Sequence, residues 1–238
     1  MIYFAHRGDS SNYPENTMLA FKKAIELEVK GIELDVHKSK DNELVVIHDE
    51  DIQRTFLGKG LVKDYTLKEL KQFSCRKDVF RDHPDCKIPT LKEVLKLIKP
   101  YELTLNIELK TDHIHYAGIE EDVLRMLEDY NLKSRVIISS FYHQSLARVK
   151  EIDSNMRTGI LFHHPIENVV EYAKNLGAWS LHPYLPLVNE KFIENAHHGD
   201  LKVNIYTVNN PEHIRRCALE KVDGIFTDYP GLCKEILS

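Results

Sequence analysis

The feature of this chain that most restricts its fold is a repeated alternation of short apolar segments with segments of helical periodicity. Strands that are regularly separated by helices need crossover connections, which produce parallel sheets, and eight such units close a barrel. We therefore predict an α/β fold, a (β/α)8 TIM barrel, and an open doubly wound sheet is the weaker alternative. The predicted strands are 1–6, 31–37, 103–109, 135–141, 156–164, 178–184, 202–208 and 223–230.

The length of the chain fits one such barrel. Its 238 residues are close to the roughly 250 of a typical barrel domain, so we predict a single domain over 1–238. Residues 38–89 break the rhythm, because KSKDNELVVIHD predicts a hairpin and DYTLKELKQF a short helix. We interpret 38–89 as an insertion on the second βα loop. Since the loops on this face of a barrel build its active site, the insertion is expected to cover the substrate.

Composition and charge narrow the possible partners. The chain carries 32 basic and 37 acidic residues, a net charge of -5, which is the wrong sign for holding nucleic acid through its phosphates. Its apolar runs are short and broken by charges, and it opens without a secretory leader pattern. We therefore expect a cytoplasmic protein without stable membrane insertion. The irregular spacing of its cysteines predicts reduced, structural thiols: Cys75, Cys86, Cys217 and Cys233.

Two predicted strands place carboxylates inside the barrel. In a strand, successive side chains point to opposite faces, so the apolar residues of 31–37 meet the helices while Glu33 and Asp35 point inward. The same argument sends Glu108 and Lys110 inward from the next predicted strand. An all-oxygen site suits one Mg²⁺ or Ca²⁺ ion. The alternative is that these carboxylates form internal salt bridges with Lys110 and Arg7.

Two histidines are predicted to flank this cluster. Alternation leaves His6 on the inward face at the end of the first strand, with the guanidinium fork of Arg7 at the rim, where it suits phosphate oxygens. A two-residue hairpin tip at 41–42 sets His48 opposite Asp35. Because imidazole titrates near neutral pH, two such groups can act as general base and general acid.

Short motifs are distributed along the whole chain: H-R-G at 6–8, P-E-N-T at 14–17, E-L-D at 33–35, H-D at 48–49, E-L-K at 108–110, V-N at 208–209 and T-D-Y-P at 227–230. Taken together, they resemble the glycerophosphodiester phosphodiesterase family, in its bacterial cytosolic type. The resemblance implies a barrel with an inserted segment after the second strand. It also implies hydrolysis of glycerophosphodiesters, such as glycerophosphocholine and glycerophosphoethanolamine, to sn-glycerol 3-phosphate and an alcohol.

The resemblance also implies roles for individual residues. His6 looks like the base and His48 like the acid; Arg7 and Lys110 look like the phosphate-binding pair; the ligands of one divalent cation are Glu33, Asp35 and Glu108. Proton removal by His6 activates either the 2-hydroxyl of the substrate glycerol, which gives a cyclic phosphate that water then opens, or a water molecule directly.

Five further polar or aromatic positions have more than one possible role or lack a motif that assigns one. Where the family commonly has a tryptophan, this chain has Tyr206, which we expect to line the pocket wall and to affect alcohol preference. Asn16 either braces the loop after the first strand or caps the following helix. Three further histidines at predicted strand ends are expected to line the pocket or to lie at the surface: His163, His164 and His182.

Two alternatives to this function remain open. A lysophospholipase D-like activity on acylated lipids needs an apolar surface near the insertion, for which Phe56, Leu57 and Leu61 are the only hints, and these residues are also suited to pack the insertion onto the barrel. A catalytically silent binding barrel is the other, because a fold alone does not establish activity. Family likeness permits a homodimer without requiring one.

Overall fold

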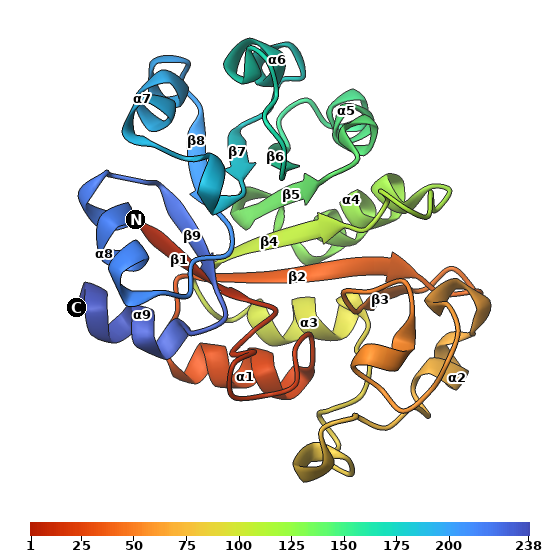
Figure 1. Ribbon diagram of the computed structural model, residues 1–238. Coiled ribbons are helices and arrows are strands. Elements are labelled where there is room, and N and C mark those ends of the chain that lie inside the picture. Colours follow the sequence, from red (N-terminus) through yellow and green to blue (C-terminus); the bar gives the residue numbers. More distant parts are fainter.

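Eight parallel strands close into a barrel in the computed structural model, which describes residues 1–238. The strand order is β1-β9-β8-β7-β6-β5-β4-β2, and pairing of β1 with β2 closes the ring (Figure 1). The predicted TIM barrel is confirmed. Its strands are β1 Ile2–His6, β2 Gly31–Lys38, β4 Thr104–Leu109, β5 Val136–Ser140, β6 Arg157–Phe162, β7 Ser180–Pro183, β8 Lys202–Ile205 and β9 Gly224–Thr227.

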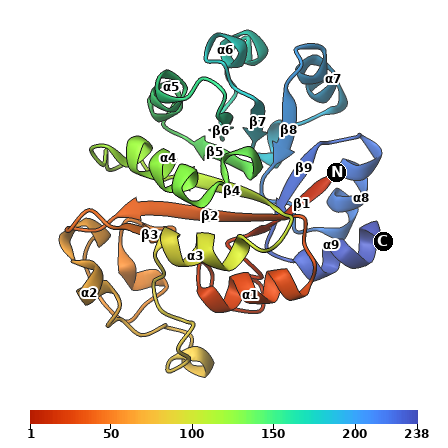
Figure 2. The same ribbon diagram turned by 180° about the vertical axis from the view of Figure 1, so that it is seen from behind.

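Helices surround the strands, as the two opposite views show (Figures 1 and 2). They are α1 Met18–Glu26, α3 Leu91–Ile98, α4 Ile119–Tyr130, α5 His143–Ile152, α6 Val169–Asn175, α7 Glu190–His198, α8 Pro211–Leu219 and α9 Pro230–Leu237. Helix α4 follows the N-cap residue Gly118, which has no side chain to accept a capping hydrogen bond. None of the helices has the length and apolar character needed to span a membrane.

The main core lies between the strands and the helices, as the alternation predicts. Ile32, Leu34 and Val36 of β2 belong to one cluster of 43 buried residues. Residues of the opposite parity fill the barrel interior, where the rings of Phe4 and Phe226 stack 4.9 Å apart. The four cysteines are free and buried, as expected.

The segment between β2 and α3 forms a separate layer beside the barrel, drawn in orange in Figure 1. It contains strand β3 (Leu44–Val46), antiparallel to β2, helix α2 (Leu67–Leu70) and three short 3-10 helices, η1 Ile52–Arg54, η2 Val62–Asp64 and η3 Asp78–Phe80. A second apolar cluster of seven buried residues, Val45, Ile47, Ile52, Phe56, Val62, Leu70 and Ile88, holds it together. The segment therefore has its own small core beside the barrel.

The hairpin register is wrong by one residue in the sequence prediction. Val36 pairs with Val46, and the backbone N–H of Ile47 donates to the carbonyl of Asp35 at 3.1 Å, so Ile47 and not His48 is opposite Asp35. The reason is a three-residue turn in place of the expected two-residue tip. Its last residue, Asn42, has a left-handed φ of 64°, as three-residue hairpin loops require.

The expectation that His182 lines the pocket or lies at the surface is also wrong. The side chain lies inside the barrel and is completely buried. Its Nε2 is 2.8 Å from Ser180 Oγ and 3.0 Å from the Asn204 amide nitrogen, and its Nδ1 has no partner. Burial lowers the pKa of His182 to about 3.

This burial predicts a specific loss of stability in mild acid. The unfolded chain binds a proton at His182 below its ordinary pKa of about 6.5, whereas the folded chain does not until about pH 3. Stability therefore falls as pH drops below 6.5, by about 2 kcal/mol at pH 5. His182→Gln removes this term, so its unfolding free energy relative to wild type should rise by that amount between pH 7.5 and pH 5 in urea titrations. A pH-independent difference contradicts the assignment.

Candidate active site

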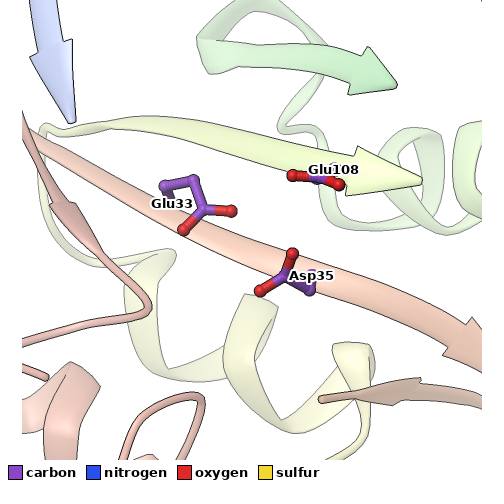
Figure 3. Close-up of side chains that lie close together, drawn as sticks. All are labelled: Glu33, Asp35 and Glu108. Carbon is purple, nitrogen blue, oxygen red and sulfur yellow. The ribbon is translucent and has the colours of Figure 1, made fainter. Parts of the chain in front are cut away.

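Three carboxylates meet at the centre of the site. Glu33 and Asp35 project from β2 and Glu108 from β4, and they point toward one another (Figure 3). Asp35 and Glu108 are direct neighbours in the parallel register, because the two strands pair there. One oxygen from each residue lies within 4.8 Å of the others, and the three residues are at most 8 % exposed.

Two carboxyl groups of this cluster have pKa values shifted in opposite directions. Burial and the neighbouring Asp35 carboxylate raise the pKa of Glu33 well above its usual range. Burial also acts to raise the pKa of Asp35, but the charges of His48, Arg7 and Lys110 outweigh it and hold that pKa low. The site thus keeps a buried carboxylate ionised next to another that resists ionisation, and an additional cation would relieve this conflict.

The residues present fit a divalent cation. Asp35 Oδ1 is buried and has no hydrogen-bond partner, although an unpaired buried carboxylate oxygen is costly. Its other oxygen, Oδ2, is occupied by Asn16. Since the three candidate ligands supply only oxygen atoms, a hard cation matches their chemistry better than zinc or copper does.

His6 is held from behind by a carboxylate from the opposite end of the chain. Its Nδ1 lies 2.6 Å from Asp228 Oδ1, and its Nε2 is 3.9 Å from Glu33 Oε2. Asn209 donates to the other Asp228 oxygen at 2.6 Å. Burial opposes ionisation of Asp228, but the hydrogen bond from His6 prevails and its pKa falls to about 2. A proton on His6 Nδ1 leaves Nε2 free to accept another from the cavity.

His48 is oriented in the same manner by the residue that follows it. Its Nδ1 lies 2.6 Å from Asp49 Oδ1, and its Nε2 lies 3.5 Å from Lys110 Nζ. The backbone carbonyl of His48 is 3.0 Å from His37 Nε2, which fixes the chain at this point. Despite the shifted register, the structure therefore brings both predicted histidines to the carboxylate cluster.

Arg7 and Lys110 supply positive charge on two sides of the carboxylates. Arg7 Nε is 3.3 Å from Asp35 Oδ2, and Lys110 Nζ donates to Glu108 Oε1 at 2.8 Å. The backbone N–H of Arg7 also donates to Glu33 Oε2 at 2.9 Å. After Arg7 the chain turns sharply onto α1, and a Cβ on Gly8 would lie 2.7 Å from Ala20. The salt bridges foreseen as an alternative to a metal site are thus present together with the cluster.

Asn16 is part of this arrangement and not a helix cap. The N-cap of α1 is Thr17, whose hydroxyl accepts from the Ala20 N–H. The Asn16 amide donates to Asp35 Oδ2 at 2.8 Å, while its own oxygen is buried without a partner. Of the two sequence-based alternatives, the capping role is wrong. Asn16 holds a carboxylate of the cluster as well as its own loop.

A cavity of about 210 Å³ lies between the two histidines and the carboxylates of Glu33 and Glu108. Polar residues occupy one side and apolar or aromatic residues the other: the lining is His6, Arg7, Glu33, His48, Asn106, Glu108, Phe141, Leu161, Tyr206, Thr207 and Phe226. Tyr206 thus lines the wall as expected, and its hydroxyl is already used, because it donates to the Phe162 carbonyl at 2.9 Å. Its ring meets Phe141 edge to face at 5.8 Å.

His163 and His164 lie outside this cavity. Both are exposed, and the His163 ring contacts Phe141 at 5.5 Å between centroids. They match the surface alternative of the sequence interpretation, and His163 reaches only the outer side of the aromatic wall.

Several residues that hold the site had no assigned role in the sequence analysis. They are Glu15, Asp49, Arg54, Asn209 and Asp228. Four of them, Glu15, Asp49, Asn209 and Asp228, lie in the quoted motifs, and this was the available signal. Arg54 lies in the insertion, and no periodicity indicated that it would reach back to the barrel.

The fold and this arrangement of carboxylates, histidines and cations are typical of a metal-dependent phosphoryl hydrolase. Residues 6–232 match the Glycerophosphoryl diester phosphodiesterase family, and the chain belongs to that family. It is 42% identical over 229 residues to a glycerophosphodiester phosphodiesterase of Caldanaerobacter subterraneus subsp. tengcongensis, covering 96% of this chain and 94% of that one. A Bacillus altitudinis relative of the same name is 41% identical over 98% of this chain and 96% of its own.

A solved structure extends this likeness to three dimensions. An Oleispira antarctica phosphodiesterase in complex with the product sn-glycerol-3-phosphate superposes with a TM-score of 0.89 and 26% sequence identity. The alignment covers 100% of this chain and 96% of that one.

Because Asn16 donates to Asp35, replacing it should destabilise the protein by more than the backbone strain of its left-handed conformation alone. Asn16→Ala removes the hydrogen bond to the Asp35 carboxylate. It also places alanine in the left-handed region at φ 54°, which asparagine adopts more readily. The matched control is Asn131→Ala, because Asn131 is exposed and has a φ of 57°. In metal-free protein, Asn16→Ala should reduce the unfolding free energy by about 1.5–3 kcal/mol more than the control, since hydrogen bonds to charged groups are worth that much. Equal losses in urea titrations contradict the contact.

Proposed function

We propose that this protein hydrolyses glycerophosphodiesters, such as glycerophosphocholine and glycerophosphoethanolamine, to sn-glycerol 3-phosphate and an alcohol. The observation that carries the proposal is a cavity lined by two oriented histidines, Arg7, Glu33 and Glu108. Asp35 and Lys110 contact these lining residues from behind, at Arg7 and Glu108 respectively. Membership of the family and the product-bound relative support the choice of substrate.

Glu33, Asp35 and Glu108 hold one divalent cation in this proposal. The unpaired Asp35 oxygen and the oxygen-only donor set support Mg²⁺ or Ca²⁺. When bound, such a cation offsets the charge that develops on the phosphoryl oxygens. The carboxylates also fix the height of the reaction centre at the carboxyl ends of β2 and β4.

His6 and His48 move the protons. His6 Nε2 removes a proton from the attacking hydroxyl, and His48 Nε2 donates one to the oxygen of the departing alcohol, so the number of protons is conserved. The Asp228 and Asp49 contacts support these roles, because each holds the opposite ring nitrogen. The attacking group is either the 2-hydroxyl of the glycerol or water. Detection of a cyclic glycerophosphate in a rapid quench distinguishes the first route.

Arg7 and Lys110 bind the phosphoryl oxygens, and Tyr206 contributes to the wall against which the substrate packs. The position of both cations beside the carboxylates supports this assignment. The insertion, residues 38–89, covers this side of the cavity by supplying His48. We place the enzyme in the cytoplasm, where its free cysteines suit a reducing environment, and homodimer formation is compatible with this function.

The acylated-lipid alternative has weaker support. Phe56 is buried in the core of the inserted segment, so it is not available to a lipid. Leu57 is 40% exposed and Leu61 is partly buried, and single surface leucines are ordinary.

The proposal predicts release of sn-glycerol 3-phosphate from glycerophosphocholine and glycerophosphoethanolamine that stops on addition of a chelator. His6→Ala and His48→Ala should each lower kcat by about 10²–10⁴-fold, the usual contribution of a general acid or base. Product is measured by coupled glycerol 3-phosphate oxidation, and folding of each variant by its circular dichroism. A folded, metal-loaded protein that releases no product from either diester contradicts the proposal and favours a silent barrel.

A further inference from the structure

Arg54 joins two carboxylates that approach it from different parts of the chain. It lies on η1 within the insertion. Its Nε and Nη2 donate to Asp49 at 2.5 and 3.2 Å, and its Nη1 and Nη2 donate to Glu15 at 2.8 and 2.7 Å. One guanidinium therefore makes two bidentate contacts, which use its planar fork fully.

Each of these carboxylates continues to a group that faces the cavity. Asp49 holds His48 through the 2.6 Å contact to Nδ1. Glu15 accepts a hydrogen bond from Arg7 Nη1 at 2.9 Å. His48 and Arg7 both line the cavity, whereas Arg54 itself does not. Arg54 is thus one contact removed from two of the groups assigned to the phosphodiester.

This network differs from an ordinary surface ion pair. The Arg54 side chain is 47% exposed, but its partners are less so, at 19% for Glu15 and 27% for Asp49. Burial opposes ionisation of Asp49, yet hydrogen bonds from His48 and Arg54 outweigh it and lower its pKa. Without Arg54, Asp49 would keep only its contact with His48 and Glu15 only its contact with Arg7, and the guanidinium that joins the two carboxylates would be lost.

We propose that Arg54 is a positioning residue that fixes the His48 imidazole, through Asp49, and the Arg7 guanidinium, through Glu15, in their places around the substrate phosphate. The inference rests on the proposed function. Arg54 lies on η1 of the insertion. It joins Asp49, which follows β3, to Glu15 in the loop after β1, so the insertion contributes a second residue to the reaction besides His48. A lysine has no planar fork and cannot hold both carboxylates in this way.

Two variants and one control test the proposal. Arg54→Gln removes the charge, and Arg54→Lys keeps the charge without the fork. The control is Arg148→Gln, because Arg148 on α5 has a similar exposure of 51% and binds two carboxylates, Glu121 and Glu151, away from the cavity. Both Arg54 variants should lower kcat on glycerophosphocholine by about 10–100-fold, as losses of supporting contacts do. Arg148→Gln should keep the wild-type value.

Two substrates with different leaving groups distinguish a misplaced His48 from a general loss of structure. A p-nitrophenyl ester of glycerol phosphate expels a stable phenolate that needs no proton, so a misplaced His48 matters little for it. Arg54→Gln should therefore lose about tenfold more in kcat on glycerophosphocholine than on this substrate, and the loss that remains on the nitrophenyl ester reports the displacement of Arg7. Equal losses on both substrates, or full rescue by Arg54→Lys, overturn the proposal.

A spectroscopic measurement decides the matter independently of turnover. The short contact from His48 Nδ1 to Asp49 predicts a slowly exchanging, downfield ring N–H proton resonance, which is assigned by its loss in His48→Ala. It should persist in Arg148→Gln and disappear in Arg54→Gln. Persistence in Arg54→Gln overturns the positioning role even when wild type proves inactive. Inactivity of wild type on all diesters, with the resonance lost in Arg54→Gln, refutes the function but leaves the positioning of His48 in place.

Discussion

Mutual repulsion among Glu33, Asp35 and Glu108 is the constraint on which the site depends. Three carboxylates whose oxygens lie within 4.8 Å of one another, almost without solvent contact, are stable only if positive charge and hydrogen bonds surround them. Arg7 and Lys110 provide the charge, and Asn16 provides the hydrogen bond. The unpaired oxygen of Asp35 shows that this compensation is incomplete, and a bound cation would complete it.

The barrel makes this grouping possible because its parallel strands end on the same face. β2 and β4 deliver the carboxylates in register, and β1 and β9 bring His6 and Asp228 together although 222 residues separate them in sequence. The barrel alone does not supply the second histidine. His48 comes from the segment between β2 and α3, whose separate apolar core keeps it beside the face. Function thus depends on the strand ends and on the inserted layer.

Sequence periodicity predicted the barrel and the inward carboxylates because alternation along β2 and β4 directly determines which side chains face the interior. It did not determine the turn of the β2–β3 hairpin, where a third loop residue shifted His48 by one position. His182 was misplaced because alternation also sends polar side chains into the closed centre of the barrel. The roles of Asp228 and Arg54 depend on contacts between distant segments, which no local pattern encodes.

The most direct test of this account is calorimetric titration of metal-free protein with Mg²⁺ and Ca²⁺, followed by thermal unfolding at each metal concentration. The account predicts one ion per chain and an unfolding temperature that rises with metal concentration, since a ligand of the folded state alone stabilises it. Both effects should vanish in Glu108→Gln, which keeps the shape of the side chain but removes its charge. Absence of binding by either ion, with unfolding insensitive to metal and to chelator, would contradict the claim that the carboxylate cluster is a cation site.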